Sequence, residues 1–193
     1  MAYSSFDKIF LNKLAGLASV GYYTFGARFA ALIKMVMSSV DKVFGPFFLK
    51  KAHQNTVEAK KEIIERFYEL CFLFMFSGFV IICFSEEMIK LLTTEEYYPS
   101  MYVVPAYVYY YLFAIPGILA SNQRMFVEKL YYEIPIIVLS LIINILLNIL
   151  LIPKFGAVGA AIATAIAALC GNIFGLYHGL RLYPLPLQIS KLV

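Results

Sequence analysis

Charged residues are scarce in this sequence, and their scarcity argues against a soluble domain. Only 15% of the 193 residues are charged, whereas 62% are hydrophobic and the mean hydropathy is +0.78. Soluble globular domains contain about 25% charged and about 45–50% apolar residues. The apolar residues here form long runs separated by short charged clusters, which is typical of membrane-spanning helices. Outer-membrane strands would alternate polar and apolar residues, and the runs 70–84 and 134–152 do not.

Residues that carry enzyme and metal chemistry are also few. Neither His53 nor His178 has a cysteine or a carboxylate at a metal-ligand spacing, and the sequence contains no glycine-rich nucleotide loop. The three cysteines all fall within apolar runs, where a small polarizable side chain serves packing. We therefore expect no enzyme activity, no cofactor, no disulfide and no metal cluster.

Five apolar segments are long enough to cross a membrane as helices, and a shorter one precedes them. The predicted spans are residues 20–49, 67–92, 101–120, 134–152 and 157–180. Residues 1–18 form only a partial first span, because Asp7, Lys8 and Lys13 interrupt its apolar core. The sequence therefore predicts an all-α, polytopic membrane helix bundle.

The Lys and Arg residues of the short loops predict the orientation of this bundle. The connector 50–66 contains five of them, the connector 121–133 contains two, and the end of the chain contains Arg181 and Lys191. The two intervening turns contain one each. We therefore expect the three richer segments to lie in the cytoplasm. In this layout residues 19–183 form a five-helix transmembrane bundle, and residues 184–193 form a cytoplasmic tail. The net charge of +4 follows from this bias, and we expect no nucleic-acid partner.

Two asparagines stand out in the aliphatic run 134–152. Asn144 and Asn148 are one helical turn apart and therefore lie on the same face of their helix. An unpaired amide in hydrocarbon costs several kcal/mol, so this face meets either a partner helix or a polar cavity. Interhelical hydrogen bonds and contact with a substrate are the two interpretations.

A helical hairpin is predicted immediately after these asparagines. Pro153 and Gly156 interrupt the apolar run and indicate a turn. Small residues then recur every three or four positions, at Gly156, Gly159, Ala160, Ala163, Ala167, Gly171 and Gly175. Such spacing lets helix backbones approach closely, so the second arm of the hairpin is expected to pack tightly.

The second predicted span contains charges that need an explanation. Lys34 and Asp41 lie close together on one face of the helix, whereas Arg28 lies on another side. A charge at the bilayer centre costs about 2.5 kcal/mol or more, so we expect these groups to face a watery interior. Asp41 is near enough to the end of the span to reach the water interface instead. For Arg28 and Lys34 the alternative is an ion pair with a carboxylate such as Asp7.

The order of several motifs resembles a known family. The motifs are DKIFLNKLAGLASVGYYTFGARFA, VFGPFF, EEYYPSMYVVP and LSLIINILLNILLIPKFGAVGAAIATAIA. In this order they resemble the C-terminal half of polysaccharide flippases of the O-antigen type, within the multidrug/oligosaccharidyl-lipid/polysaccharide exporter superfamily. The resemblance covers nearly the whole chain, and its most specific parts are VGYYTFGARFA and the pair of asparagines followed by LIPKFG.

The resemblance implies a function, a partner and a location. Such proteins have two six-helix lobes around a V-shaped cavity, and they move a polyprenyl-pyrophosphate-linked oligosaccharide across the bacterial or archaeal inner membrane by alternating access. This chain would supply about one lobe, with a truncated first helix. The other lobe would be a missing N-terminal lobe or a second copy of the chain. The resemblance places Asp7, Arg28 and Lys34 beside the cavity, where cations suit a pyrophosphate.

Two alternative functions remain open at this stage. A cation-coupled multidrug exporter of the same superfamily would need acids inside the membrane, and Asp7 and Asp41 are the candidates. A membrane scaffold subunit without transport activity is the other alternative. Membrane lipids are expected partners in every case.

Overall fold

The computed structural model describes residues 2–187, and this part of the chain is helical without any strand. The all-α prediction is therefore confirmed. The elements are α1 (Ala2–Gln54), α2 (Val57–Leu92), η1 (Glu95–Tyr102), α3 (Val103–Phe113), α4 (Ile115–Phe126), η2 (Leu130–Tyr132) and α5 (Glu133–Leu182). The predicted tail 184–193 is described only as far as Leu187, so Lys191 lies outside the described residues.

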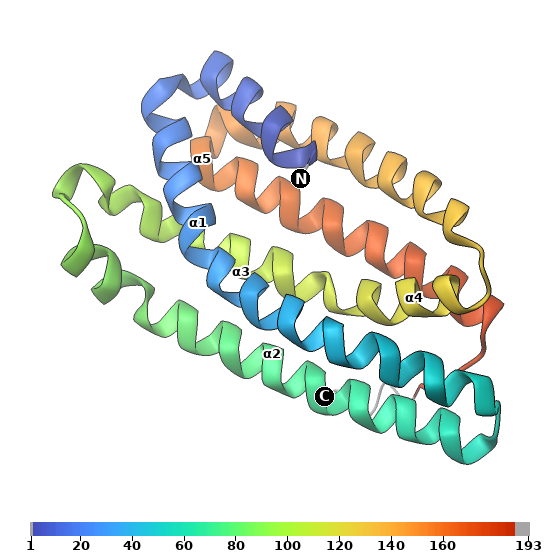
Figure 1. The fold of residues 1–193 in the computed structure, drawn as a ribbon. Coiled ribbons are helices and arrows are strands. Elements are labelled where there is room, and N and C mark those ends of the chain that lie inside the picture. The colour runs from blue at the N-terminus through green and yellow to red at the C-terminus, as the bar shows by residue number, and fades with distance from the viewer. Residues whose placement is uncertain (1, 188–193) are drawn as a thin grey trace.

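Helix α1 consists of two arms that meet at a sharp bend. Gly16 has φ 82° and ψ 168°, a left-handed conformation that favours glycine because it has no Cβ. The bend separates a short N-terminal arm from a long arm that continues to Gln54 (Figure 1). As a result, the short arm folds back and brings Asp7 toward the long arm and α5.

The predicted connector 50–66 is almost entirely helical. Helix α1 ends at Gln54 and α2 begins at Val57, so only two residues separate the helices. The Thr56 side chain caps α2 by accepting a hydrogen bond of 3.1 Å from the Ala59 amide. The charges of this segment therefore lie on helix ends, where Lys51 pairs with Glu62 across the turn.

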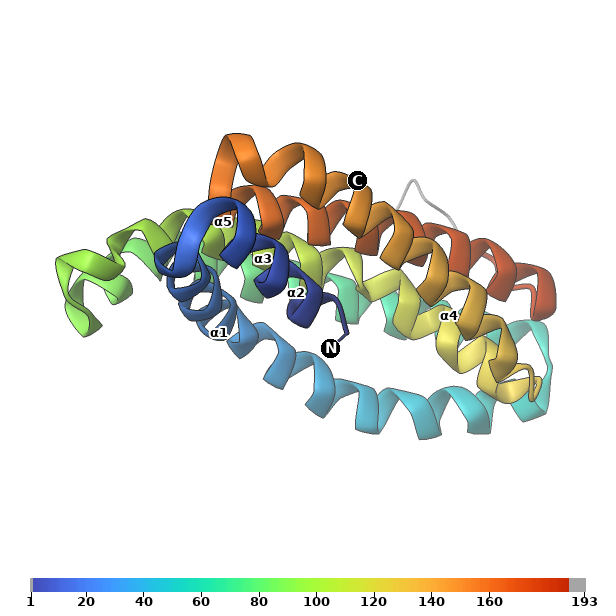
Figure 2. The same cartoon turned by 90° about the horizontal axis from the view of Figure 1, so that it is seen from above.

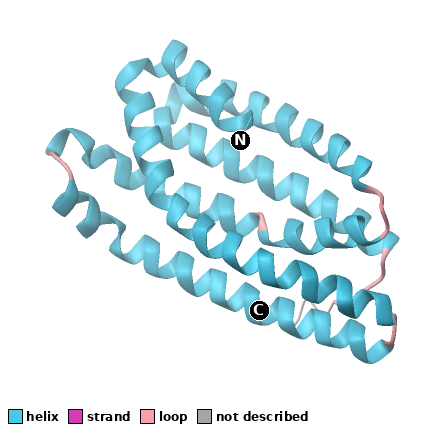
Figure 3. Cartoon of the chain, in the orientation of Figure 1, coloured by secondary structure: helices cyan, strands magenta, loops and turns pink. Residues whose placement is uncertain are grey.

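The predicted span 101–120 begins in the last two residues of η1 and is then divided between α3 and α4. Ala114 separates α3 from α4, and the sequence Ile115-Pro116-Gly117 follows the break. Proline lacks an amide hydrogen and fits best in the first turn of a helix, which explains why α4 starts here. Figure 3 shows the break as a short loop within an otherwise helical segment. Helix α4 then continues to Phe126, so the first half of the predicted connector 121–133 is helical.

Helix α5 forms a helical hairpin. Its turn contains Pro153 and Gly156, and Gly156 has φ 53° and ψ −129°. The two arms run side by side in opposite directions (Figures 1 and 2). A Cβ atom on Gly159 would lie 2.5 Å from the Leu151 carbonyl oxygen, which shows how closely the arms approach near the turn. Only glycine permits this approach.

Within residues 2–187, three helical segments are long and apolar enough to cross a membrane. They are Val57–Leu92, Glu95–Phe126 and Leu130–Leu182, the last of which contains both arms of the hairpin. Helix α2 also exposes large apolar side chains, including Phe72 and Leu91. Lipid is the environment in which such side chains are stable, so these features indicate a membrane protein.

The helices are arranged around α3, α4 and the second arm of α5. Helix α1 contacts both α3 and α5, whereas α2 packs against α1 and α3 at the edge of the bundle. Figure 2 shows α1 along one side and the hairpin of α5 along the other. One face of α1 contacts α3, α4 and α5. The polar side chains of the candidate functional site described below lie on this face.

Candidate functional site

Asp7 is fully buried and lies at the centre of a group of neutral polar side chains. The Tyr23 hydroxyl donates a hydrogen bond to its Oδ2. Thr164 Oγ1 also donates to Oδ2, at 2.8 Å, and Asn148 Nδ2 donates to Oδ1 at 2.6 Å. The Tyr23 and Asn148 donors suit an ionised carboxylate, which only accepts hydrogen bonds, whereas the single Thr164 hydrogen can go either to Asp7 or to the Ala160 carbonyl at 3.0 Å.

The two predicted asparagines join this group from α5. Asn144 Nδ2 donates to Thr164 Oγ1 at 3.1 Å, which connects the two arms of the hairpin. Asn148 Nδ2 lies 3.1 Å from Asn144 Oδ1, so the two amides contact each other along one face. Both asparagines are fully buried and hold Asp7 between them and Tyr23. We call the five residues Asp7, Tyr23, Asn144, Asn148 and Thr164 the Asp7 cluster.

One oxygen of the Asp7 cluster has no hydrogen-bond partner. Asn148 Oδ1 is buried and accepts no hydrogen bond from any described residue. Buried polar atoms in native proteins nearly always have a hydrogen-bond partner, so the unpaired Asn148 Oδ1 is unusual. It lies in a cluster whose other oxygens belong to a carboxylate, an amide and two hydroxyl groups.

Tyr107 of α3 extends the cluster toward the protein surface. Its hydroxyl donates to the Tyr23 hydroxyl at 2.5 Å, and the two rings pack edge to face with centroids 5.3 Å apart. Both rings are buried. A line of hydroxyl groups therefore runs from Tyr107 through Tyr23 to Asp7.

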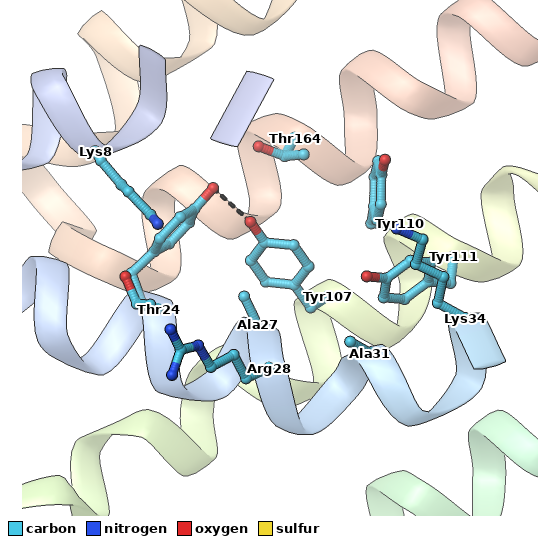
Figure 4. A pocket seen from close by; sticks show the side chains of 11 residues that line it. Lys8, Thr24, Ala27, Arg28, Ala31, Lys34, Tyr107, Tyr110, Tyr111 and Thr164 are labelled. Carbon is cyan, nitrogen blue, oxygen red and sulfur yellow. Dashed lines mark hydrogen bonds between the residues drawn. The ribbon is translucent and has the colours of Figure 1, made fainter. Parts of the chain in front are cut away.

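A pocket of about 250 Å³ begins where this line ends, and we call it the basic pocket. It is lined by Lys8, Tyr23, Thr24, Ala27, Arg28, Ala31, Lys34, Tyr107, Tyr110, Tyr111 and Thr164 (Figure 4). The lining residues on the long arm of α1 recur at intervals of about one helical turn, so the pocket brings together Arg28 and Lys34, which were predicted to lie on different sides of this helix. Figure 4 shows Arg28 and Lys34 on either side of Tyr107.

The basic pocket has three cations in its lining and no acid. Lys8, Arg28 and Lys34 are all exposed, and no ion pair links any of them to a described carboxylate. The ion pair with Asp7, which was the alternative interpretation of Arg28 and Lys34, is therefore absent from residues 6–187. Asp7 contacts neutral side chains instead, because the break at Gly16 turns it toward Tyr23 and α5. The cations remain available to a ligand.

A second and larger hollow of about 850 Å³ lies further along the same face of α1, and we call it the mixed-charge pocket. The lining residues are Asp41, Lys42, Gly45, Pro46, Leu49, Ala114, Gly117, Ile118, Ser121, Asn122, Arg124, Met125, Leu130, Glu133, Ile136, Ile137, Asn172 and Gly175. Asp41 therefore lies here, and not beside Arg28 and Lys34. Its neighbour in the lining is a cation, Lys42, and both side chains are exposed.

Arg124 is the buried cation of the mixed-charge pocket, and all of its nitrogens are bonded. Its Nη2 and Nε lie 2.7 Å and 2.9 Å from Glu133 Oε1, and its Nη1 donates to the Gly175 carbonyl at 2.9 Å. The Arg124 side chain is 3% exposed, whereas that of Glu133 is 31% exposed. The pair ties the end of α4 to both arms of α5.

The sequence prediction did not include Tyr23, Tyr107, Thr164 or the Arg124–Glu133 pair. Thr164 carries a weak signal, because it is the one hydroxyl residue between Gly156 and Leu169. The arginine and the glutamate stand at either end of a short polar connector, where opposite charges are usually solvated. No local signal distinguishes Tyr23 and Tyr107 from the other thirteen tyrosines.

The Asp7 cluster is rich in oxygen atoms but contains a single carboxylate. Within residues 6–187, no three His, Cys, Asp or Glu side chains form a group that could hold a metal ion. Carboxylate, amide and hydroxyl oxygens are ligands that suit hard cations, and a single buried carboxylate suits a proton. The three cysteines are free, and only Cys71 among them is buried.

Comparisons with protein-family models, with curated proteins and with solved structures found no match to this chain.

Proposed function

We propose that this chain forms one lobe of a membrane flippase that moves a lipid-linked oligosaccharide across the inner membrane by alternating access. The observation that carries the proposal is the basic pocket, where Lys8, Arg28 and Lys34 meet without an acid. Cations in a site partly screened from water form strong charge-assisted hydrogen bonds with phosphate oxygens. A polyprenyl pyrophosphate presents such oxygens at the end of a chain that stays in the membrane.

The resemblance of the motifs to O-antigen-type flippases supports the same function. Arg28 belongs to the motif VGYYTFGARFA, and the hairpin of α5 belongs to the motif LIPKFG. In this proposal the second lobe comes from another polypeptide segment or from a second copy of the chain. The cell membrane is bacterial or archaeal, and the partners are the lipid-linked glycan and membrane lipids.

Export by a reconstructed full-length transporter tests this function. We expect Arg28→Ala and Lys34→Ala to abolish glycan export while membrane protein levels stay normal, because these exposed cations stabilise no described partner. Arg28→Lys and Lys34→Arg keep the charge and should retain part of the activity. Lys61→Ala is the matched control, since Lys61 is an exposed cation of α2 outside both pockets. Normal export by the double alanine variant at normal abundance would overturn the proposal.

Cation-coupled export of drugs is the second candidate, and the Asp7 cluster favours it. A buried intramembrane carboxylate is a default candidate for a proton or cation site. The orphaned Asn148 Oδ1 lies in the same cluster and offers a further oxygen ligand. The two candidates share this coupling chemistry and differ in the substrate. Efflux of lipophilic cationic drugs that depends on a sodium or proton gradient, without glycan export, would favour the second candidate.

A further inference from the structure

The basic pocket and the buried Asp7 carboxylate are joined by two tyrosine hydroxyls. Tyr23 and Tyr107 both line the pocket, and Tyr23 also contacts Asp7. We propose that Tyr23 and Tyr107 form a hydroxyl relay that couples the charge of Asp7 to the binding of a phosphate-type anion in the basic pocket. The proposal rests on the proposed function, because it takes that pocket as the anion site.

The relay follows from the number of hydrogens that the two phenols possess. Each hydroxyl has one hydrogen to donate and two lone pairs that accept. In the structure the Tyr107 hydrogen points to Tyr23 and the Tyr23 hydrogen points to Asp7. Both phenol hydrogens therefore point toward Asp7, and neither points into the basic pocket. The oxygen of Tyr107 can offer only lone pairs to the pocket, and an anion there would be repelled.

Neutralisation of Asp7 changes this arrangement. When a proton or a bound cation compensates the carboxylate, the Tyr23 hydrogen is no longer held there by a negative charge. The two hydroxyls can then rotate about their C–O bonds, so that Tyr23 donates to Tyr107 and Tyr107 donates into the pocket. The pocket gains a hydrogen-bond donor and loses a nearby negative charge. Both changes favour an anion between Lys8, Arg28 and Lys34.

The coupling is reciprocal, because linkage between two binding events acts equally in both directions. An anion in the basic pocket holds the Tyr107 hydrogen toward itself and thereby favours a neutral Asp7. A transporter built in this way takes up its anionic substrate and a proton or cation together.

The other groups that face Asp7 do not provide an equivalent route. From α5 it meets the neutral side chains of Asn144, Asn148 and Thr164, and from α1 it meets Tyr23. The basic pocket beyond Tyr23 and Thr164 is lined by three described cations, Lys8, Arg28 and Lys34. Thr164 reaches both the pocket and Asp7, but its hydroxyl also lies 3.0 Å from the Ala160 carbonyl of its own helix. That carbonyl can hold the Thr164 hydrogen when Asp7 is neutral, whereas the phenols have no such alternative among their described bonds.

Binding of inorganic pyrophosphate to the full chain in lipid nanodiscs tests the relay. Affinity is measured over a range of pH for the wild-type chain, for Tyr107→Phe and for Tyr111→Phe. The ratio between two proteins at one pH is used, because the ionisation of pyrophosphate itself then cancels. Tyr111 is the matched control, since it lines the same pocket and has no described hydrogen bond to Tyr23 or Asp7.

We expect the ratio of wild-type affinity to Tyr107→Phe affinity to rise about tenfold as the pH falls and Asp7 becomes neutral. The ratio of wild-type affinity to Tyr111→Phe affinity should stay constant. Phenylalanine keeps the ring packing of residue 107, so the fold is retained. Asp7→Asn provides a second measurement that needs no change of pH: it should bind pyrophosphate about tenfold more tightly than the wild type, and adding Tyr107→Phe should remove most of that gain.

The outcomes separate the relay from the function on which it rests. Binding of pyrophosphate with a constant wild-type to Tyr107→Phe ratio would overturn the relay and leave the anion site intact. Absence of pyrophosphate binding by the wild-type chain, at every pH, would overturn the anion site and the relay together. Equal pH-dependent changes in Tyr107→Phe and Tyr111→Phe would also overturn the relay.

Discussion

The two pockets on α1 contain similar numbers of charged residues but use them differently. In the mixed-charge pocket the buried Arg124 is fully bonded to Glu133 and to a backbone carbonyl, so its charge stabilises the fold. In the basic pocket, Arg28 and Lys34 are exposed and have no described ion pair. A bonded charge is a structural element, whereas a free cation in a membrane protein is available for a ligand. The comparison predicts that substitutions in the two pockets will affect different properties.

The largest effect on stability is expected from Glu133→Ala. This variant leaves the buried Arg124 guanidinium without its carboxylate, and removing one partner of a buried pair costs about 3 kcal/mol or more. Denaturant unfolding of the chain in detergent measures this loss. The double variant Arg124→Met with Glu133→Met should lose less, because no unpaired charge remains buried. Glu87→Ala, an exposed glutamate of α2, is the control and should change stability by less than about 0.5 kcal/mol.

The comparison would fail if Glu133→Ala unfolded like the wild-type chain. Arg124 would then be compensated by some other group, and the mixed-charge pocket would resemble the basic pocket in having replaceable charges.

The next largest effect is a loss of binding, from Arg28→Ala. A hydrogen bond to a charged group contributes about 1.5–3 kcal/mol, so pyrophosphate affinity should fall about tenfold to 100-fold. The free energy of unfolding should stay within about 0.5 kcal/mol of the wild type, because Arg28 is exposed and unpaired. Calorimetry and denaturant unfolding on the same preparation measure the two quantities. A large loss of stability with unchanged binding would assign Arg28 to the fold.

A smaller loss of folding stability is expected from Asn148→Leu, a substitution in the Asp7 cluster. Leucine has the same branching of side-chain heavy atoms, although it is bulkier, and it cannot donate to Asp7 Oδ1, so Asp7 loses one of its three described donors. Leaving a buried acceptor with fewer partners costs about 1–3 kcal/mol, here reduced because the orphaned Asn148 Oδ1 disappears as well. Asn172→Leu is the control, since the one described hydrogen bond of the Asn172 amide goes to the Ala168 carbonyl of its own helix. Equal stability of the two variants would contradict the role of the Asp7 cluster in packing.

The sequence predicts the hairpin and its asparagines well because the signals are local. Pro153 and Gly156 interrupt a helix wherever they occur in an apolar run, and the four-residue spacing of Asn144 and Asn148 determines their common face. The all-α bundle follows from the length of the apolar runs for the same reason.

The contacts of Asp7 could not be predicted, because they depend on segments far apart in the chain. Asp7 meets Asn148 and Thr164 only because the helix bends at Gly16 and the hairpin of α5 returns beside it. An ion pair of Asp7 with Arg28 or Lys34 is one of the two alternatives that charge alone suggests, and the described residues do not form it. Similarly, hydropathy places Arg124 in a loop, although α4 continues past it and buries its side chain.

The smallest effects are expected from neutralising the exposed charges of the mixed-charge pocket, and they test whether the two pockets bind anions independently. Asp41 and Lys42 are exposed, and neither has a described ion pair. Asp41→Asn and Lys42→Met should therefore change the free energy of unfolding by less than about 0.5 kcal/mol. Pyrophosphate affinity should also stay within about twofold of the wild type, because each of these exposed charges lies outside the lining of the basic pocket and is screened by water and salt. If Lys42→Met weakened pyrophosphate binding as strongly as Arg28→Ala does, the two pockets would form one continuous anion path along α1, and the distinction between them would have to be abandoned.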